Sequence, residues 1–194
     1  MNENYSLEDV DISKVKNTIL DLLIKQLNNN INEQEIQFIK DAVKIYPNII
    51  IEIEFGPDKI FELIEKNTSL SFSILYQISQ CAEYENYLIL FIQRKWSINS
   101  LKVMNMLIQL IEFPNIFIKT YIKHCISQLQ KENNQNQKHR MRLLLSFFIC
   151  NLLENHHITF ECIPSSIDEI FKGDSSFREI LILKEKIEQY RNEL

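Results

Sequence analysis

The sequence predicts an all-α protein of about ten helices, and two observations support this fold class. Apolar residues recur at the three- and four-residue spacing of a helix face along most of the 194 residues. The chain has only two glycines and four prolines, too few for the turns of an all-β fold. Helices joined by short connections favour antiparallel neighbours, arranged either as an α-solenoid or as a compact helical domain.

The first two helices have clear ends. Apolar residues over 12–27 follow one helix face, and the three asparagines at 28–30 end that helix. A capping box opens the second helix, because Asn32 is placed to accept a hydrogen bond from the first turn and Glu35 to reach back to the Asn32 backbone. Pro47 then ends the second helix.

The segment 48–55, NIIIEIEF, has the alternation and β-branched residues of a strand. A lone strand would have no pairing partner in this chain, and Pro47 suits the first turn of a helix. We therefore expect a short helix rather than a strand. Pro57 and Asp58 open the next helix, which ends near Asn67. The same periodicity predicts further helices at 69–81, 83–93, 99–113, 115–130, 139–154, 166–171 and 175–192, with Gly173 as a helix stop.

The organisation expected from length and composition is a single helical domain over 1–194. Residues 1–10 form a polar N-terminal tail. The segment 131–138, KENNQNQK, is predicted to be a polar linker between two helices. It is too polar to bury and too short to separate two independent cores.

Charge and composition indicate the compartment and exclude some partners. The net charge of -5 argues against a general nucleic-acid binder, because phosphate recognition needs clustered Lys and Arg. The acidic, polar start of the chain does not resemble a secretory signal. The longest apolar run, 143–153, is shorter than the ~20 residues of a membrane span. The four cysteines lack C-x-x-C spacing, which fits reduced thiols in the cytoplasm or nucleus.

No combination of residues predicts catalysis, a metal or a cofactor. Cys150, His156, His157 and Cys162 fall within one short span, but structural zinc sites favour close ligand pairs and none occurs here. Adjacent helical residues such as His124 and Cys125 point about 100° apart, so they cannot act as base and nucleophile. Glycine-rich nucleotide-binding loops are missing from the sequence. We therefore expect a protein that is not an enzyme.

Basic and aromatic residues give a candidate partner surface. Lys119 and Lys123 lie four apart on one predicted helix, and Arg140 and Arg142 begin the next. If these helices are antiparallel, the charges near the connection could form a patch for an acidic peptide; a solvated helix face is the alternative. Trp96 falls in a connection between helices, where a half-exposed ring would suit an interface anchor, although packing in the core is the alternative.

The stretch from Ser100 to Ser127 carries a specific pattern of residues. It reads S-x-x-V-x-N-x-L, then an acidic-apolar-Pro turn, then F-I-x-x-Y-I-x-x-C-I-S. This pattern resembles the C-terminal domain of subunit 11 of the Ccr/Not mRNA deadenylase complex. The matching residues are Ser100, Val103, Asn105, Leu107, Glu112, Phe113, Pro114, Phe117, Ile118, Tyr121, Ile122, Cys125, Ile126 and Ser127.

The resemblance covers about 17–194 and has two departures. The family's Asn-Asn-Pro helix break reads Lys66-Asn67-Thr68 here. The second arginine of the family's R-x-x-R pair would fall on Leu143, with Arg142 one place early. Outside 100–127, the matches are Pro57, Lys59, Leu63, Glu65, Asn67, Tyr87, Ser97 and Arg140.

The resemblance implies a non-enzymatic adaptor in mRNA poly(A)-tail shortening and decay. In that family, subunit 11 joins subunit 10 on the large scaffold subunit, and its C-terminal domain docks other proteins. The expected partners are therefore these subunits and recruited regulatory proteins, with no nucleic acid, membrane or cofactor. The chain looks like the docking domain without the family's N-terminal attachment region. The alternatives are an RNA-binding helical repeat protein, which needs a basic stripe with stacking aromatics, and a small helical enzyme with a deep polar pocket.

Overall fold

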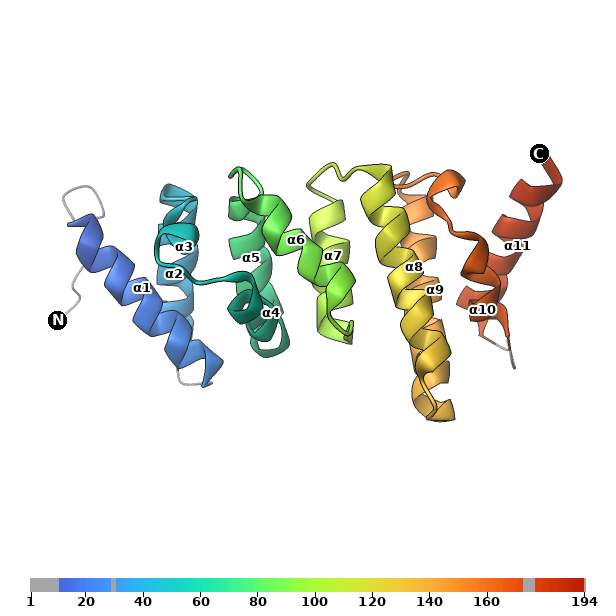
Figure 1. Cartoon of the computed structure of the whole chain (residues 1–194), viewed down its shortest axis with the longest axis horizontal. Coiled ribbons are helices and arrows are strands. Elements are labelled where there is room, and N and C mark those ends of the chain that lie inside the picture. The colour runs from blue at the N-terminus through green and yellow to red at the C-terminus, as the bar shows by residue number, and fades with distance from the viewer. Residues whose placement is uncertain (1–10, 29–30, 173–176, 194) are drawn as a thin grey trace. The chain divides into compact units, whose positions relative to one another are not determined.

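The computed structural model describes residues 11–28, 31–172 and 177–193. Within these ranges every regular element is a helix and there is no strand, so the predicted all-α fold is confirmed (Figure 1). Eleven α-helices and two short 3-10 helices make up this part of the chain. The predicted tail at 1–10 and the helix stop at Gly173 lie outside the described residues.

The chain divides into two compact units, residues 1–90 and 91–194, and each is described by itself. The division falls inside α6, Tyr84–Gln93. The predicted single domain over 1–194 stays a prediction.

Unit 1 is held together by α5, which packs against both α2 and α4, while α1 packs against the same two helices. Fully buried aliphatic side chains such as Leu23, Ile39 and Leu63 form its core. Each comes from the apolar face of an amphipathic helix, as the sequence periodicity predicts. The helices of this unit before α6 are α1 (Ile12–Leu27), α2 (Glu33–Ile45), α3 (Ile49–Glu52), α4 (Pro57–Lys66) and α5 (Thr68–Ile78).

The helix starts in unit 1 depend on asparagine caps. The predicted capping box is confirmed, since Asn32 Oδ1 accepts from the Glu35 N–H at 3.0 Å and Glu35 Oε2 accepts from the Asn32 N–H at 2.8 Å. The segment 48–55 contains the short helix α3, as expected, and not a strand. Asn67 ends α4 and caps α5, accepting from the Leu70 N–H at 2.9 Å. The helix break therefore forms without the family's proline.

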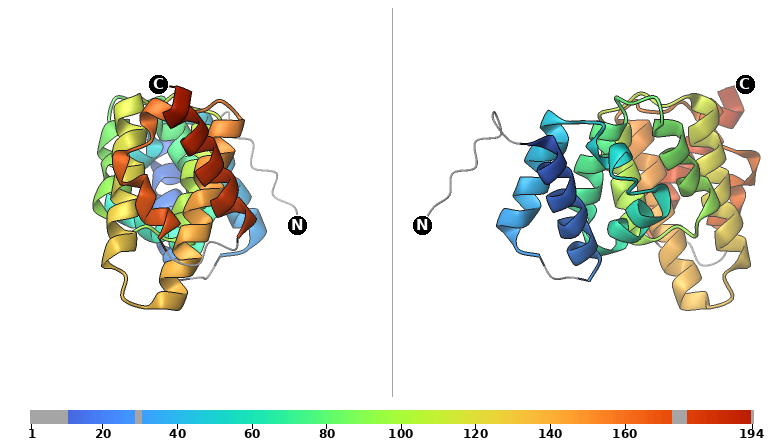
Figure 2. Two further views of the ribbon diagram at one scale, coloured as in Figure 1. Left: turned by 90° about the vertical axis from the view of Figure 1, so that its right-hand side faces the viewer. Right: turned by 60° about the vertical axis from the view of Figure 1, so that its left-hand side comes forward.

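Unit 2 is built on a helical hairpin. The helices α8 and α9 pack side by side and are joined by a short turn, so they are antiparallel (Figure 2). The last helix packs along α9, and the short helices between them pack on α8. Its elements after α6 are α7 (Ile98–Ile108), α8 (Asn115–Lys131), α9 (Gln135–Glu154), η2 (Phe160–Cys162), η3 (Ser165–Ile167), α10 (Asp168–Phe171) and α11 (Arg178–Glu193).

Two predicted boundaries in unit 2 are wrong. The helix expected over 99–113 ends at Ile108, well before Pro114. The linker expected over 131–138 shrinks to the residues 132–134, because α9 already begins at Gln135. Asn134 caps α9 by accepting from the Gln137 N–H at 3.1 Å. Polar residues that cap or propagate a helix well thus make the segment mostly helical despite its polarity.

The core of unit 2 centres on Tyr121, which is fully buried. Its ring meets the edges of Phe91 and Phe148 at centroid distances of 6.3 and 6.0 Å. Cys125, one turn further along α8, is also fully buried, as its periodicity predicts. All four cysteines of the chain lie in the described part and are free thiols. No described helix is long and apolar enough to cross a membrane.

Candidate docking site

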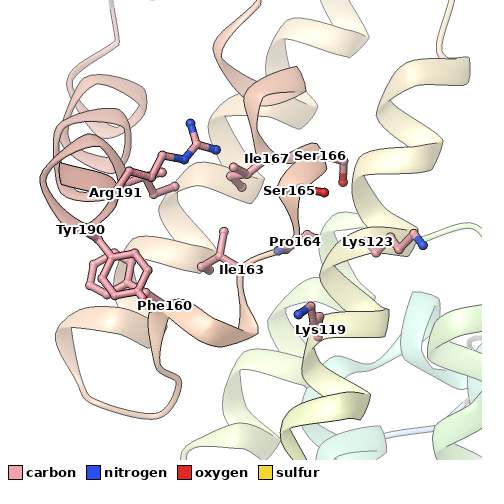
Figure 3. Close-up of a pocket in the computed structure, with 11 residues that line it drawn as sticks. Lys119, Lys123, Phe160, Ile163, Pro164, Ser165, Ser166, Ile167, Tyr190 and Arg191 are labelled. Atoms are coloured by element: carbon pink, nitrogen blue, oxygen red, sulfur yellow. The ribbon is translucent and has the colours of Figure 1, made fainter. Parts of the chain in front are cut away.

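Lys119 and Lys123 of α8 line a pocket of about 500 Å³. The other walls come from η2, η3 and the C-terminal half of α11. In Figure 3 the Lys119 ammonium lies on the pocket side of α8, while the Lys123 ammonium is turned to the outer side of the helix. We call this hollow the α8–α11 pocket. It is lined by Lys119, Lys123, Phe160, Ile163, Pro164, Ser165, Ser166, Ile167, Ile187, Tyr190 and Arg191.

The amphipathic pattern of α8 explains the position of the two lysines. Ile118 and Ile122 are buried, and each lysine follows one of them directly in the sequence. Residues four apart share a helix face, so Lys119 and Lys123 lie together on the exposed side. Both residues border the pocket, and η2 and η3, which supply other walls, pack against α8.

The far wall of the α8–α11 pocket is aromatic and aliphatic. Phe160 of η2 stacks on Tyr190 of α11, with ring centroids 4.6 Å apart and planes inclined by 12°. Ile163 and Ile187 add aliphatic surface to the same pocket. The sequence did not predict this wall, because Phe160 and Tyr190 are about thirty residues apart in the chain and no local pattern joins them.

Free positive charge is concentrated at the lysine side of the pocket. Arg191 is neutralised by Asp168, which accepts two parallel hydrogen bonds at 3.0 and 3.3 Å. Lys119 and Lys123, by contrast, have no ion-pair or hydrogen-bond partner among the described residues. The pocket therefore has the Lys119 ammonium beside an apolar wall, and Lys123 adds a second unpaired positive charge at its outer edge.

Trp96 does not have the half-exposed position that its place in a connection suggested. Only 5% of the residue is exposed, and its indole Nε1 donates to the Cys125 carbonyl at 3.3 Å. Its backbone N–H donates to Gln128 Oε1 at 3.0 Å, and the Gln128 side chain also donates to the Arg94 carbonyl at 3.0 Å. Of the two alternatives for Trp96, packing in the core is the one that the structure shows, because α8 supplies hydrogen-bond partners that fix the connection.

The two arginines predicted beside the lysines lie on different faces of α9. Residues two apart on a helix point about 200° apart, and Arg140 is exposed whereas Arg142 is half-buried. Arg140 lines a second hollow of about 440 Å³ together with Trp96. The Arg142 Nε is buried with no hydrogen-bond partner in the described structure. The structure thus groups the predicted site residues as Lys119 with Lys123, and Trp96 with Arg140, leaving Arg142 apart.

Two buried thiols of unit 2, those of Cys125 and Cys150, lack the environment of a nucleophile. Burial raises the pKa of the Cys150 thiol to about 11, the nearby Glu154 adding to the shift. Burial also raises the pKa of Cys125 well above its ordinary value. Reactive thiols need a lowered pKa, so these two remain protonated near neutral pH. No cluster of three or more metal-binding side chains occurs among the residues that the structure describes.

Fold and site together define an all-helical protein with a solvent-open pocket that combines free lysines with apolar side chains. A family model described as CCR4-NOT transcription complex subunit 11 (CNOT11) matches residues 64–185. This match covers more than half of the chain, and the chain belongs to that family. The matched region contains Lys119, Lys123 and Phe160 but ends before Tyr190 and Arg191.

Proposed function

We propose that this chain is a non-enzymatic adaptor of the CCR4-NOT complex. The adaptor binds partner proteins and thereby supports mRNA poly(A)-tail shortening and decay. Membership of the subunit 11 family is the observation that carries the proposal. The proposed place of action is the cytoplasm, and the proposed partners are subunit 10, the large scaffold subunit and recruited regulatory proteins.

The mechanism of the adaptor is capture of a short segment of a partner protein. Such capture needs apolar pockets for side chains and a charged rim that orients the segment. The α8–α11 pocket supports this mechanism, because Lys119 and Lys123 line it on one side and the Phe160 and Tyr190 rings line it on the other. Charges on the rim mainly speed association, and apolar burial slows dissociation.

Affinity purification from the cells that make the protein tests membership in the complex. The tagged chain is expected to recover subunit 10 and the large scaffold subunit, measured by quantitative mass spectrometry against a tagged unrelated helical protein. Ribonuclease treatment before capture serves as a second control, because recovery through bound RNA is lost on that treatment. Absence of both subunits from the recovered proteins, with the tagged chain intact, would contradict the proposal.

A second measurement tests the non-enzymatic assignment. The purified chain is incubated with a labelled RNA that ends in oligoadenylate, with and without Mg²⁺, and the RNA length is followed on a denaturing gel. We expect no shortening in either condition. Shortening that follows the chain through two different purification steps would show that it is a nuclease.

A further inference from the structure

We propose that the α8–α11 pocket binds an acidic, apolar peptide segment, one in which an Asp or Glu lies beside an aliphatic or aromatic side chain. The proposal rests on the adaptor function and adds the chemistry of the segment that is captured. Lys119 binds the carboxylate, Lys123 adds a second positive charge at the outer edge of the pocket, and the wall formed by Phe160, Ile163 and Tyr190 holds the neighbouring apolar side chain.

The positive charge of the pocket indicates that its ligand carries a negative charge. Lys119 and Lys123 are exposed, four residues apart and without an anionic partner among the described residues. Like charges at this spacing repel each other on a helix, so an anion bound by Lys119 reduces an unfavourable interaction with Lys123. Arg191 is already neutralised by Asp168 and does not need a second anion. The carboxylate therefore binds at the α8 side of the pocket.

The shape of the pocket indicates the residue next to the carboxylate. Between the lysines and the stacked rings lie Ile163 and Pro164, the former half-buried and the latter buried (Figure 3). Burying an apolar side chain there removes apolar surface of both partners from water. The exposed hydroxyl of Ser165 lies on the same pocket and can donate a hydrogen bond to the ligand backbone.

A peptide fits these features better than a nucleic acid does. Single-stranded nucleic acid is bound by a continuous basic groove with aromatic faces on which bases stack. Here only two free cations line the pocket, and Phe160 and Tyr190 already stack on each other. The net charge of the chain, -5, also opposes binding of a polyanion.

Peptide selection on the purified chain tests the proposal. A displayed library of random peptides about twelve residues long is selected on the wild type, and recovered peptides are measured by fluorescence polarisation. We expect enrichment of Asp or Glu next to an aliphatic or aromatic residue, and at least about tenfold weaker binding to the Lys119→Glu/Lys123→Glu variant. The matched control is Lys14→Glu/Lys102→Glu, which makes the same charge change at two exposed lysines outside the pocket.

Three results overturn the proposal. The first is that selected peptides bind the Lys119→Glu/Lys123→Glu variant as tightly as the control variant, with helicity by circular dichroism unchanged. The second is a selection that yields no lysine-dependent peptide. The third is that labelled single-stranded oligoadenylate, rather than peptide, binds through the two lysines. The Tyr190→Ala variant provides a further check, because it does not alter the charge of the pocket. We expect it to bind peptides that carry an aromatic residue more weakly than the wild type does.

Failure of this inference is distinguishable from failure of the adaptor function. The peptide selection uses the purified chain alone, whereas the adaptor function is judged by recovery of complex subunits from cells. The wild type could recover the complex subunits while the selected peptides bind independently of Lys119 and Lys123. In that case the adaptor function would stand, and its docking surface would lie elsewhere on the chain.

Discussion

The indole Nε1 of Trp96 donates a hydrogen bond to the main-chain carbonyl of Cys125 over 3.3 Å. This bond joins the connection after α6 to the middle of α8, and it fixes a ring that is almost entirely buried. Trp96 therefore contributes to the stability of unit 2 through packing and one hydrogen bond. Its contribution to partner binding remains a prediction.

Two substitutions of Trp96 should separate the stability contributed by its packing from that contributed by its hydrogen bond. Trp96→Ala is expected to lower the free energy of unfolding by about 3–5 kcal/mol, because it opens a cavity in the core. Trp96→Phe keeps much of the apolar volume but loses the indole hydrogen bond to the Cys125 carbonyl, which still accepts from the α8 backbone, at a cost of about 0.5–1.5 kcal/mol. Urea unfolding followed by circular dichroism measures both values. Equal stability of all three proteins would show that the ring is not packed as described.

Charge reversal at Arg140 and Arg142 should have different consequences. Arg140 is exposed, so Arg140→Glu should change the free energy of unfolding by no more than about 0.5 kcal/mol. Arg142→Glu moves a carboxylate into a half-buried position and should cost about 1–3 kcal/mol. Arg142→Met, which keeps the aliphatic length, should cost less than Arg142→Glu. Similar unfolding midpoints for Arg140→Glu and Arg142→Glu would argue that both side chains are solvated.

The hydrogen bond from Asn151 Nδ2 to Asn105 Oδ1, at 2.9 Å, links α9 to α7. A double-mutant cycle with Asn105→Ala and Asn151→Ala should give a coupling energy of about 0.5–1.5 kcal/mol. The measurement is urea unfolding of the four proteins in the cycle. Additive effects of the two substitutions would mean that the bond contributes nothing to stability.

Alkaline pH should destabilise unit 2 partly through Tyr121. Burial raises the pKa of this phenol well above its ordinary value. The folded state therefore keeps its proton when the unfolded state has lost it, so stability is complete below about pH 10 and falls as the pH rises further. Tyr121→Phe removes this contribution, which amounts to roughly 1 kcal/mol near pH 10.5. Between neutral and alkaline pH the urea midpoint should fall further for the wild type than for Tyr121→Phe, and an equal fall in both proteins would show that Tyr121 does not carry the effect.

Local sequence signals predicted the helices better than the site. The box of Asn32 and Glu35 depends on residues three apart, and its geometry follows from the sequence alone. Lys119 and Lys123 were grouped correctly for the same reason, since residues four apart share a helix face. The grouping of Arg140 with Arg142 failed because their spacing of two places them on different faces.

The features that escaped prediction depend on contacts between distant segments. Trp96 is buried because Cys125 and Gln128, about thirty residues later, supply its partners. The Phe160–Tyr190 stack likewise joins η2 to α11, and neither residue belongs to a local motif. Periodicity identifies which face of a helix is buried, but it does not identify which other helix covers that face.

The position of Trp96 gives the protein a natural optical probe of one unit. It is the only tryptophan in the chain, and it lies in unit 2, so unit 1 contributes nothing to tryptophan emission. A buried indole should emit at short wavelength and shift to the red when unit 2 opens, whereas circular dichroism reports on helices throughout the chain. If the two signals change at the same urea concentration, units 1 and 2 unfold as one cooperative block; if they separate, each unit has its own transition. An unlabelled sample is thus enough to decide whether the two units share one folding equilibrium.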